Sequence, residues 1–97
     1  MKLLLLSLIF IGYLPIVHSQ IILLDPGHGG DDLGARIELE GRMIYEKDLA
    51  LSLTKRIKQR LEKRKYLVFM SRSFDRNVSL EERAEMAEKV KADIFIS

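Results

Sequence analysis

The feature that most limits how this chain can fold is a four-residue apolar run, residues 21–24, that stops at Asp25-Pro26-Gly27. A short apolar run closed by turn-forming residues is typical of a strand buried on both faces. Such strands occur in parallel sheets whose faces are covered by helices. The run therefore predicts an α/β fold built around a parallel sheet.

Segments with strand spacing and helix spacing alternate beyond this run. The expected order is a polar loop over residues 28–45, a helix over 46–63, a strand over 66–70, a helix over 80–91 and a strand over 92–97. A Ser-x-x-Glu capping box at Ser79 marks the start of the second helix. The alternation predicts right-handed crossovers, which bring the carboxyl ends of all three strands to one edge of the sheet.

Each predicted helix carries one apolar stripe that we expect to pack on the sheet. The stripes are Leu49, Leu53, Ile57 and Leu61 in the first helix, and Leu80, Ala84 and Ala87 in the second. Three strands and two helices would still leave sheet edges and the covering of one face unfinished. We therefore expect residues 20–97 to be the N-terminal part of a larger domain, truncated after the third strand.

Residues 1–19 have the layout of a secretory signal peptide. Lys2 precedes an apolar run over residues 3–17, and the expected cut follows Ser19. An uncleaved anchor helix is the alternative, but the run is shorter than the roughly 20 apolar residues that span a bilayer. We therefore expect export to the periplasm or cell envelope and no stable membrane anchor after cleavage. His28 is then the one histidine of the mature chain.

Composition excludes several other classes of function. The net charge is +2, and basic residues are interspersed with acidic ones, which gives none of the one-sided basic patches typical of nucleic-acid binding. Cysteine is absent, which excludes disulfides, thiol nucleophiles and thiolate zinc sites. Nothing in the sequence predicts an oligomer.

His28 and Glu46 are the candidate metal ligands. His28 follows the first strand between glycines, so it either forms a tight turn or presents an imidazole to a metal. Glu46 shares a helix face with Leu49 and Leu53, so its carboxylate requires a partner. That partner is either the backbone amides of the first helical turn or a cation shared with His28. Because a catalytic zinc site takes three protein ligands, a third would come from elsewhere.

Other charged residues near this edge are assigned supporting roles. Asp25 is expected to fix the turn or to accept a hydrogen bond from His28. Asp31 and Asp32 are expected to form the turn itself. Three charged residues farther along are expected to form an ion-pair set that braces the loops: Arg72, Asp75 and Arg83.

Short motifs follow one another along the mature chain. They are LDPGHGG at residues 24–30, Asp32 with Gly34-Ala35, EKDL at 46–49, Ser71-Arg72, Asp75, Leu80, Arg83 and ADIFIS at 92–97. In order and spacing they resemble the zinc-dependent N-acetylmuramoyl-L-alanine amidases of the Amidase_3 type. Leu33, Ser71 and Glu88 depart from the family pattern and leave the shape of the substrate groove open.

The resemblance implies that His28 and Glu46 bind Zn2+. It also implies a third ligand, a histidine, just after the strand that ends at Ser97, and a catalytic glutamate later still. The implied reaction is cleavage of the amide between N-acetylmuramic acid and L-alanine in peptidoglycan by zinc-activated water. With neither of the later residues present, residues 20–97 are expected to be inactive alone.

Two other functions remain as alternatives. One is a catalytically dead cell-wall-binding remnant of the same fold. The other is a nucleotide-binding module, suggested by the Gly-rich turn between a strand and a helix. The second is disfavoured, since no Gly-Lys-Ser/Thr follows and Asp32 stands where a third dinucleotide-binding glycine would be needed.

Overall fold

The computed structural model describes Gly12 and residues 18–97. Most of the predicted signal peptide, including Lys2 and nearly all of the apolar run, lies outside the described residues. The elements are β1 (Ile21–Leu24), β2 (Arg36–Leu39), β3 (Arg42–Tyr45), α1 (Glu46–Lys63), β4 (Leu67–Met70), α2 (Leu80–Lys89) and β5 (Ile94–Ile96). Within the described part of the chain, no helix has the length and apolar character needed to cross a bilayer.

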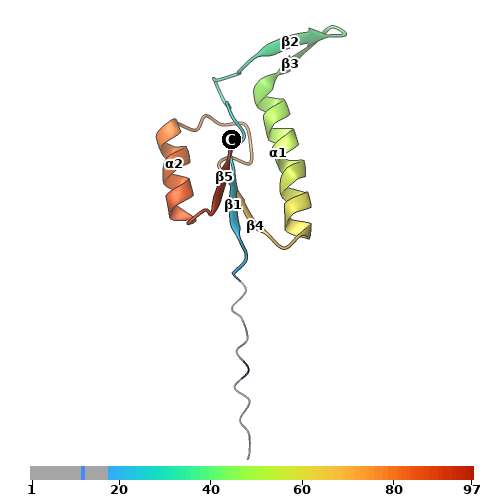
Figure 1. Ribbon diagram of the computed structural model, residues 1–97. Helices are drawn as coiled ribbons and strands as arrows, with labels where there is room; N and C mark the ends of the chain where they lie inside the picture. Colours follow the sequence, from blue (N-terminus) through green and yellow to red (C-terminus); the bar gives the residue numbers. More distant parts are fainter. Residues whose placement is uncertain (1–11, 13–17) are drawn as a thin grey trace, which may run out of the picture.

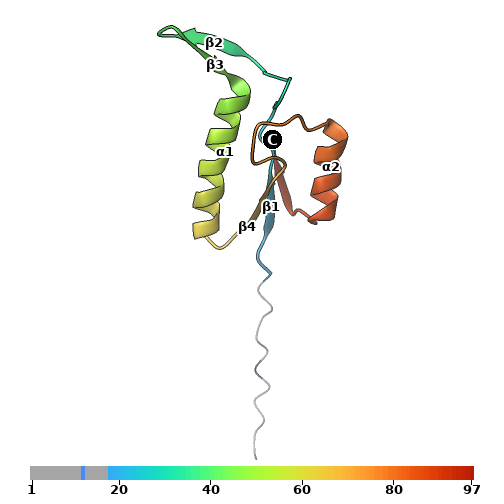
Figure 2. The same cartoon turned by 180° about the vertical axis from the view of Figure 1, so that it is seen from behind.

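A three-stranded parallel sheet forms the centre of the fold, which confirms the predicted α/β class. Its order is β4-β1-β5, and Ile22 of β1 lies opposite both Val68 and Ile94. α1 connects β1 to β4, and α2 connects β4 to β5, so the two crossovers run in opposite directions across the sheet. The two helices consequently lie on opposite sides of the sheet (Figure 1, and from behind in Figure 2). Each face therefore has one helix.

The buried core is small and centred on β1. Its hydrophobic members are Ile22, Leu23, Leu24, Val68 and Val78. Leu61 near the end of α1, with Tyr66 and Met70, packs against it. The apolar run that opened the sequence is therefore the middle of the sheet, as predicted.

The prediction that both helices bury their apolar stripes is wrong over most of their length. Leu49 and Leu53 of α1 are 57% and 61% exposed, and Leu80 of α2 is 84% exposed. The partly buried residues of α1 lie on a neighbouring face, which carries Ala50, Thr54 and Leu61. The helix is therefore rotated relative to the predicted stripe, of which Leu61 packs against the core.

The predicted loop over residues 28–45 contains a β-hairpin that the sequence did not predict. β2 and β3 pair antiparallel, and the turn residues Glu40 and Gly41 have φ of 52° and 75°. Positive φ at both central positions is the type I′ geometry, for which Asn or Asp usually precedes Gly. Because glutamate occupies that position here, the turn signal was weak. The hairpin extends away from the sheet and leads directly into α1 (Figure 1).

The observed ends of both helices lie within two residues of the predicted ones. α1 spans residues 46–63, as predicted. α2 begins after Ser79, whose side chain accepts a hydrogen bond from the Glu82 amide at 3.1 Å, and it ends at Lys89, two residues earlier than expected. The capping prediction at Ser79 is therefore confirmed.

Candidate metal centre

His28 and Glu46 meet at the carboxyl end of β1. His28 lies in the loop that follows β1, and Glu46 is the first residue of α1. The Nε2 atom of His28 is 2.9 Å from Oε2 of Glu46, and the side chains are 34% and 47% exposed. The structure thus brings together the two residues that the sequence singled out.

Asp32 holds the other side of the His28 ring. The Nδ1 atom of His28 is 3.0 Å from each carboxylate oxygen of Asp32. This hydrogen bond is the main cause that lowers the pKa of Asp32 below its usual value. A carboxylate at Nδ1 favours the tautomer whose proton is on Nδ1, which leaves the lone pair of Nε2 free for a metal. Asp32, and not Asp25, therefore occupies the supporting position behind His28.

The Glu46 carboxylate is fixed from the loop and not from its own helix. Its Oε2 accepts a hydrogen bond from the Ala35 amide at 2.9 Å, and the Glu46 amide donates to the Ala35 carbonyl at 2.8 Å. Gly34 lies against this pair with φ of 66°. A Cβ at Gly34 would lie 2.7 Å from Cδ2 of His28 and 2.8 Å from Cβ of Glu46. Only glycine fits there without displacing one of the two side chains.

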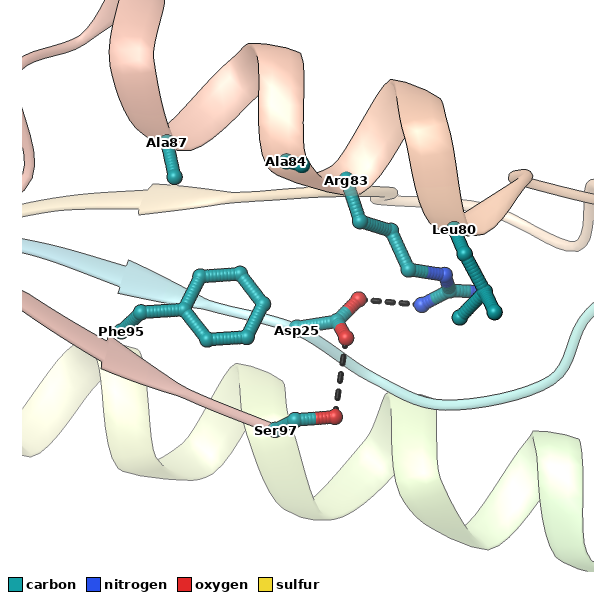
Figure 3. A pocket seen from close by; sticks show the side chains of 7 residues that line it. All are labelled: Asp25, Leu80, Arg83, Ala84, Ala87, Phe95 and Ser97. Atoms are coloured by element: carbon teal, nitrogen blue, oxygen red, sulfur yellow. Dashed lines mark hydrogen bonds and ion pairs between the residues drawn. The ribbon is translucent and has the colours of Figure 1, made fainter.

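Asp25 anchors the start of the loop in a different way from that predicted. Its carboxylate accepts hydrogen bonds from Ser71 at 2.6 Å and from Ser97 at 2.9 Å, and it forms a buried ion pair with Arg83. Figure 3 shows Asp25 between Arg83 of α2 and Ser97 at the end of β5, with Phe95 beside it. The carboxylate therefore ties together β1, β4, β5 and α2 beneath the candidate site.

The predicted ion-pair set of Arg72, Asp75 and Arg83 is wrong in its partners. Asp75 pairs with Lys47 at 2.7 Å and accepts from the Gly30 amide at 2.7 Å. Arg83 pairs with Asp25, and Arg72 donates to backbone carbonyls. All three residues brace the loops, but each does so through a different contact.

Lys47 is a contributor that the sequence analysis missed. Its Nζ also donates to the Gly30 carbonyl at 3.0 Å, so it connects α1 to the far end of the His28 loop. The hydrogen bond with Asp75 raises the pKa of Lys47 and lowers that of Asp75. A positive charge in the first turn of a helix interacts unfavourably with the helix dipole. The position of Lys47 in that turn was therefore the feature of the sequence that could have indicated an acidic partner.

The site opens into a hollow between the His28 loop and α2. This hollow has a volume of about 480 Å³, and His28, Asp32, Asn77, Arg83 and Ser97 are among the residues that line it. The carboxyl end of β5 therefore faces the same space as the imidazole.

The donor set fits a zinc ion in kind but supplies too few ligands. Two ligands bound at about 2.0–2.1 Å to tetrahedral zinc lie about 3.3 Å apart, so the 2.9 Å separation needs only a slight opening. Among the residues described here, no group of three His, Cys, Asp or Glu side chains is arranged to hold a metal ion. Asp32 is engaged at the opposite ring nitrogen of His28.

This chain is similar to one characterised family and to several curated proteins. The family described as N-acetylmuramoyl-L-alanine amidase, Amidase_3, matches residues 22–97. The chain is 40% identical over 78 residues to N-acetylmuramoyl-L-alanine amidase AmiC of Escherichia coli O6:H1, covering 79% of this chain and 18% of that protein. It is 39% identical over 83 residues to N-acetylmuramoyl-L-alanine amidase LytC of Bacillus subtilis, covering 86% of this chain and 16% of that protein.

Solved structures give the same result for the fold. N-acetylmuramoyl-L-alanine amidase AmiC2 of Nostoc punctiforme superposes with a TM-score of 0.70 at 39% identity, over 80% of this chain and 43% of that one. The catalytic domain of CwlV, N-acetylmuramoyl-L-alanine amidase from Bacillus (Paenibacillus) polymyxa var. colistinus, gives 0.70 at 31% identity, over 79% of this chain and 42% of that one. The chain spans less than half the length of each of these relatives. From residue 22 to residue 97, this chain belongs to the Amidase_3 family of N-acetylmuramoyl-L-alanine amidases.

Proposed function

We propose that the protein to which this chain belongs hydrolyses the amide between N-acetylmuramic acid and L-alanine in peptidoglycan, using zinc held in part by His28 and Glu46. The observation that carries this proposal is the convergence of Nε2 and Oε2 to 2.9 Å at the carboxyl end of β1. In open α/β sheets this is the edge where ligands bind. Membership of a family of peptidoglycan amidases supplies the substrate class.

The residues of the chain have distinct tasks in this proposal. His28 gives a neutral nitrogen ligand because Asp32 holds its Nδ1 proton. Glu46 gives an anionic oxygen whose position is fixed by the Ala35 amide. When bound, a zinc ion supplies Lewis-acid activation of water and of the scissile carbonyl.

The third ligand is proposed to lie outside residues 20–97. A catalytic zinc site takes three protein ligands, and the described residues bring together two. The carboxyl end of β5 opens into the hollow lined by His28, which makes the chain that follows β5 the natural source of a third ligand. On this account residues 20–97 alone bind zinc weakly and do not cleave peptidoglycan, and the complete protein acts outside the cytoplasm.

A wall-binding remnant without catalysis is the second candidate, because the described residues bring together two of the three ligands that a catalytic zinc site takes. The same assay separates the two functions. The protein is titrated with zinc by calorimetry, and dye release from labelled peptidoglycan is measured, for the 97-residue chain and for a version extended by the C-terminal portion of an amidase domain.

We expect weak zinc binding by the short chain that His28→Ala and Glu46→Gln each abolish, and dye release only from the extended protein. Zinc binding that is unchanged in both variants would refute the proposed ligands. Dye release by the short chain would refute its proposed inactivity. An extended protein that binds peptidoglycan without cleaving it would favour the remnant.

A further inference from the structure

Arg72 is a buried cation that faces backbone carbonyls. Its residue is 2% exposed, at the point where the chain leaves β4. Its guanidinium donates to four carbonyl oxygens: Pro26 at 3.1 Å, Gly27 at 2.8 Å, Lys47 at 2.9 Å and Phe74 at 3.3 Å. Four of its five N–H donors are thus used on the backbone.

Burying this charge is costly, because no carboxylate pairs with it directly. Among the described residues, none of the ion pairs within 4.0 Å includes Arg72. Burial accordingly lowers the pKa of Arg72, while Asp75 and Asp25 oppose the shift only through charge at longer range. A charge buried without an ionic partner costs stability. The four hydrogen bonds from Arg72 to backbone carbonyls therefore matter more for the geometry of the loops than for stability.

One nitrogen of Arg72 joins the two elements that carry the proposed ligands. Nη2 donates both to the Gly27 carbonyl and to the Lys47 carbonyl. Gly27 immediately precedes His28, and Lys47 immediately follows Glu46. A single nitrogen atom therefore helps to restrain the separation between the two backbone segments that carry the proposed ligands.

The loop also packs directly against the guanidinium. A Cβ built on Gly29 would lie 2.9 Å from Nε of Arg72. His28 itself has φ of 61°, in the left-handed region that residues with a side chain occupy infrequently. The Arg72 bond to the Gly27 carbonyl and the Arg83 bond to the His28 carbonyl at 3.2 Å restrain the backbone on either side of it.

We infer that Arg72 is a positioning residue for the metal site, which holds His28 and Glu46 at ligating separation by fixing the carbonyls next to each of them. This inference rests on the proposed function, since it assumes that both side chains bind the same ion. A lysine would keep the charge but could not donate to four carbonyls in fixed directions, because only the planar guanidinium presents such a rigid set of donors.

The test compares Arg72→Lys with Val68→Ala in the full 97-residue chain. Val68 is 6% exposed and packs with Ile22 and Leu24 in the core cluster of the sheet, so its truncation controls for general destabilisation. Arg72→Ala serves as a second variant, and urea unfolding followed by circular dichroism establishes which variants fold. Zinc affinity is measured by calorimetry, and proximity of the His28 and Glu46 side chains by nuclear Overhauser effects without metal.

We expect Arg72→Lys to weaken zinc binding about 10- to 100-fold, the range seen when a group that orients a ligand is removed. We also expect it to lose the His28–Glu46 Overhauser effect. Val68→Ala should lower stability while changing affinity less than about two-fold and keeping the effect. Arg72→Lys with unchanged affinity and an intact effect would overturn the inference.

The two readouts separate this inference from the proposed function. If the unsubstituted chain binds no zinc, or binds it equally well after His28→Ala, the proposed function fails. The metal-free Overhauser effect still reports on Arg72 in that case. Its loss in Arg72→Lys but not in Val68→Ala supports the positioning role, and its persistence in both refutes it.

Discussion

The Nε2 atom of His28 lies 2.9 Å from Oε2 of Glu46, although one residue follows a strand and the other opens a helix. Neither side chain is deeply buried, and each has a second partner: Asp32 at Nδ1 of the imidazole, and the Ala35 amide at Oε2 of the carboxylate. The pair is therefore arranged before any metal arrives. Prior arrangement of this kind reduces the entropy lost on binding.

Asp32→Asn should weaken zinc binding by about 10- to 100-fold, because an amide is a poorer acceptor for the Nδ1 proton and holds the His28 tautomer less firmly. Asp32 is exposed, but the lowered pKa of its carboxyl group means that its charge also adds some stability at neutral pH, so we expect a small decrease in the urea unfolding midpoint. Asp31→Asn at the adjacent exposed position is the matched control and should leave affinity unchanged. Calorimetric titration of both variants makes the comparison. Equal affinities for the two variants would contradict the role given to Asp32.

Gly34→Ala should damage the site more than the same change at Gly41. Both glycines have positive φ, 66° and 75°, so alanine costs each about 1–2 kcal/mol of backbone strain. A Cβ at Gly34 also collides with His28 and Glu46, whereas one at Gly41 meets nothing within 4 Å. We expect Gly41→Ala to keep zinc affinity and Gly34→Ala to lose it, with the larger loss of stability in the latter. Urea unfolding and calorimetry measure the two effects separately.

Asp75→Asn should change how stability depends on pH. The bond from Lys47 lowers the pKa of Asp75 in the folded state below its usual value of 3.8. A depressed carboxyl pKa contributes stability that is fully present above the unfolded value and is lost as pH falls through the folded value. Wild type should therefore be more stable than Asp75→Asn at pH 7, and the difference should shrink below about pH 4. Urea unfolding at a series of pH values tests this, and a difference that is constant down to pH 2 would contradict it.

Ser79→Ala should destabilise α2 by about 1 kcal/mol through loss of the cap bond to the Glu82 amide. Ser73 is exposed and lies outside the helices, so Ser73→Ala is the matched control. Urea unfolding of the two variants is the measurement. Because Arg83 of α2 donates to the His28 carbonyl, a modest loss of zinc affinity should accompany the loss of the cap. If Ser73→Ala has the same effect as Ser79→Ala, the cap does not hold the helix.

Features that depend on local pattern could be predicted from the sequence. The apolar run over residues 21–24 and the helical spacing after Glu46 predicted the parallel α/β sheet and the meeting of His28 and Glu46 at one edge, although not the order of the strands within the sheet. The type I′ turn at Glu40 could not be predicted with the same ease, because its residue types are unusual for that turn.

Hydrogen bonds between side chains and backbone carbonyls far away in the sequence could not be predicted. Arg72 and Lys47 donate to carbonyls of the His28 loop, and carbonyls leave no trace in the identity of the residues that carry them. Charge pattern alone paired the basic residues with the nearest acidic ones and so gave the wrong partners. Burial of the helix stripes was mispredicted because the rotation of a helix about its own axis depends on tertiary packing, which the spacing of apolar residues does not determine.

The two hydrogen bonds between Ala35 and Glu46 close a ring around the β2–β3 hairpin. The segment from Arg36 to Tyr45 is therefore a loop whose two ends are held together by hydrogen bonds at the site. Such an arrangement lets the hairpin change in length or sequence while the imidazole and the carboxylate keep their spacing. A change confined to the hairpin is therefore expected to leave the spacing of the two proposed ligands intact.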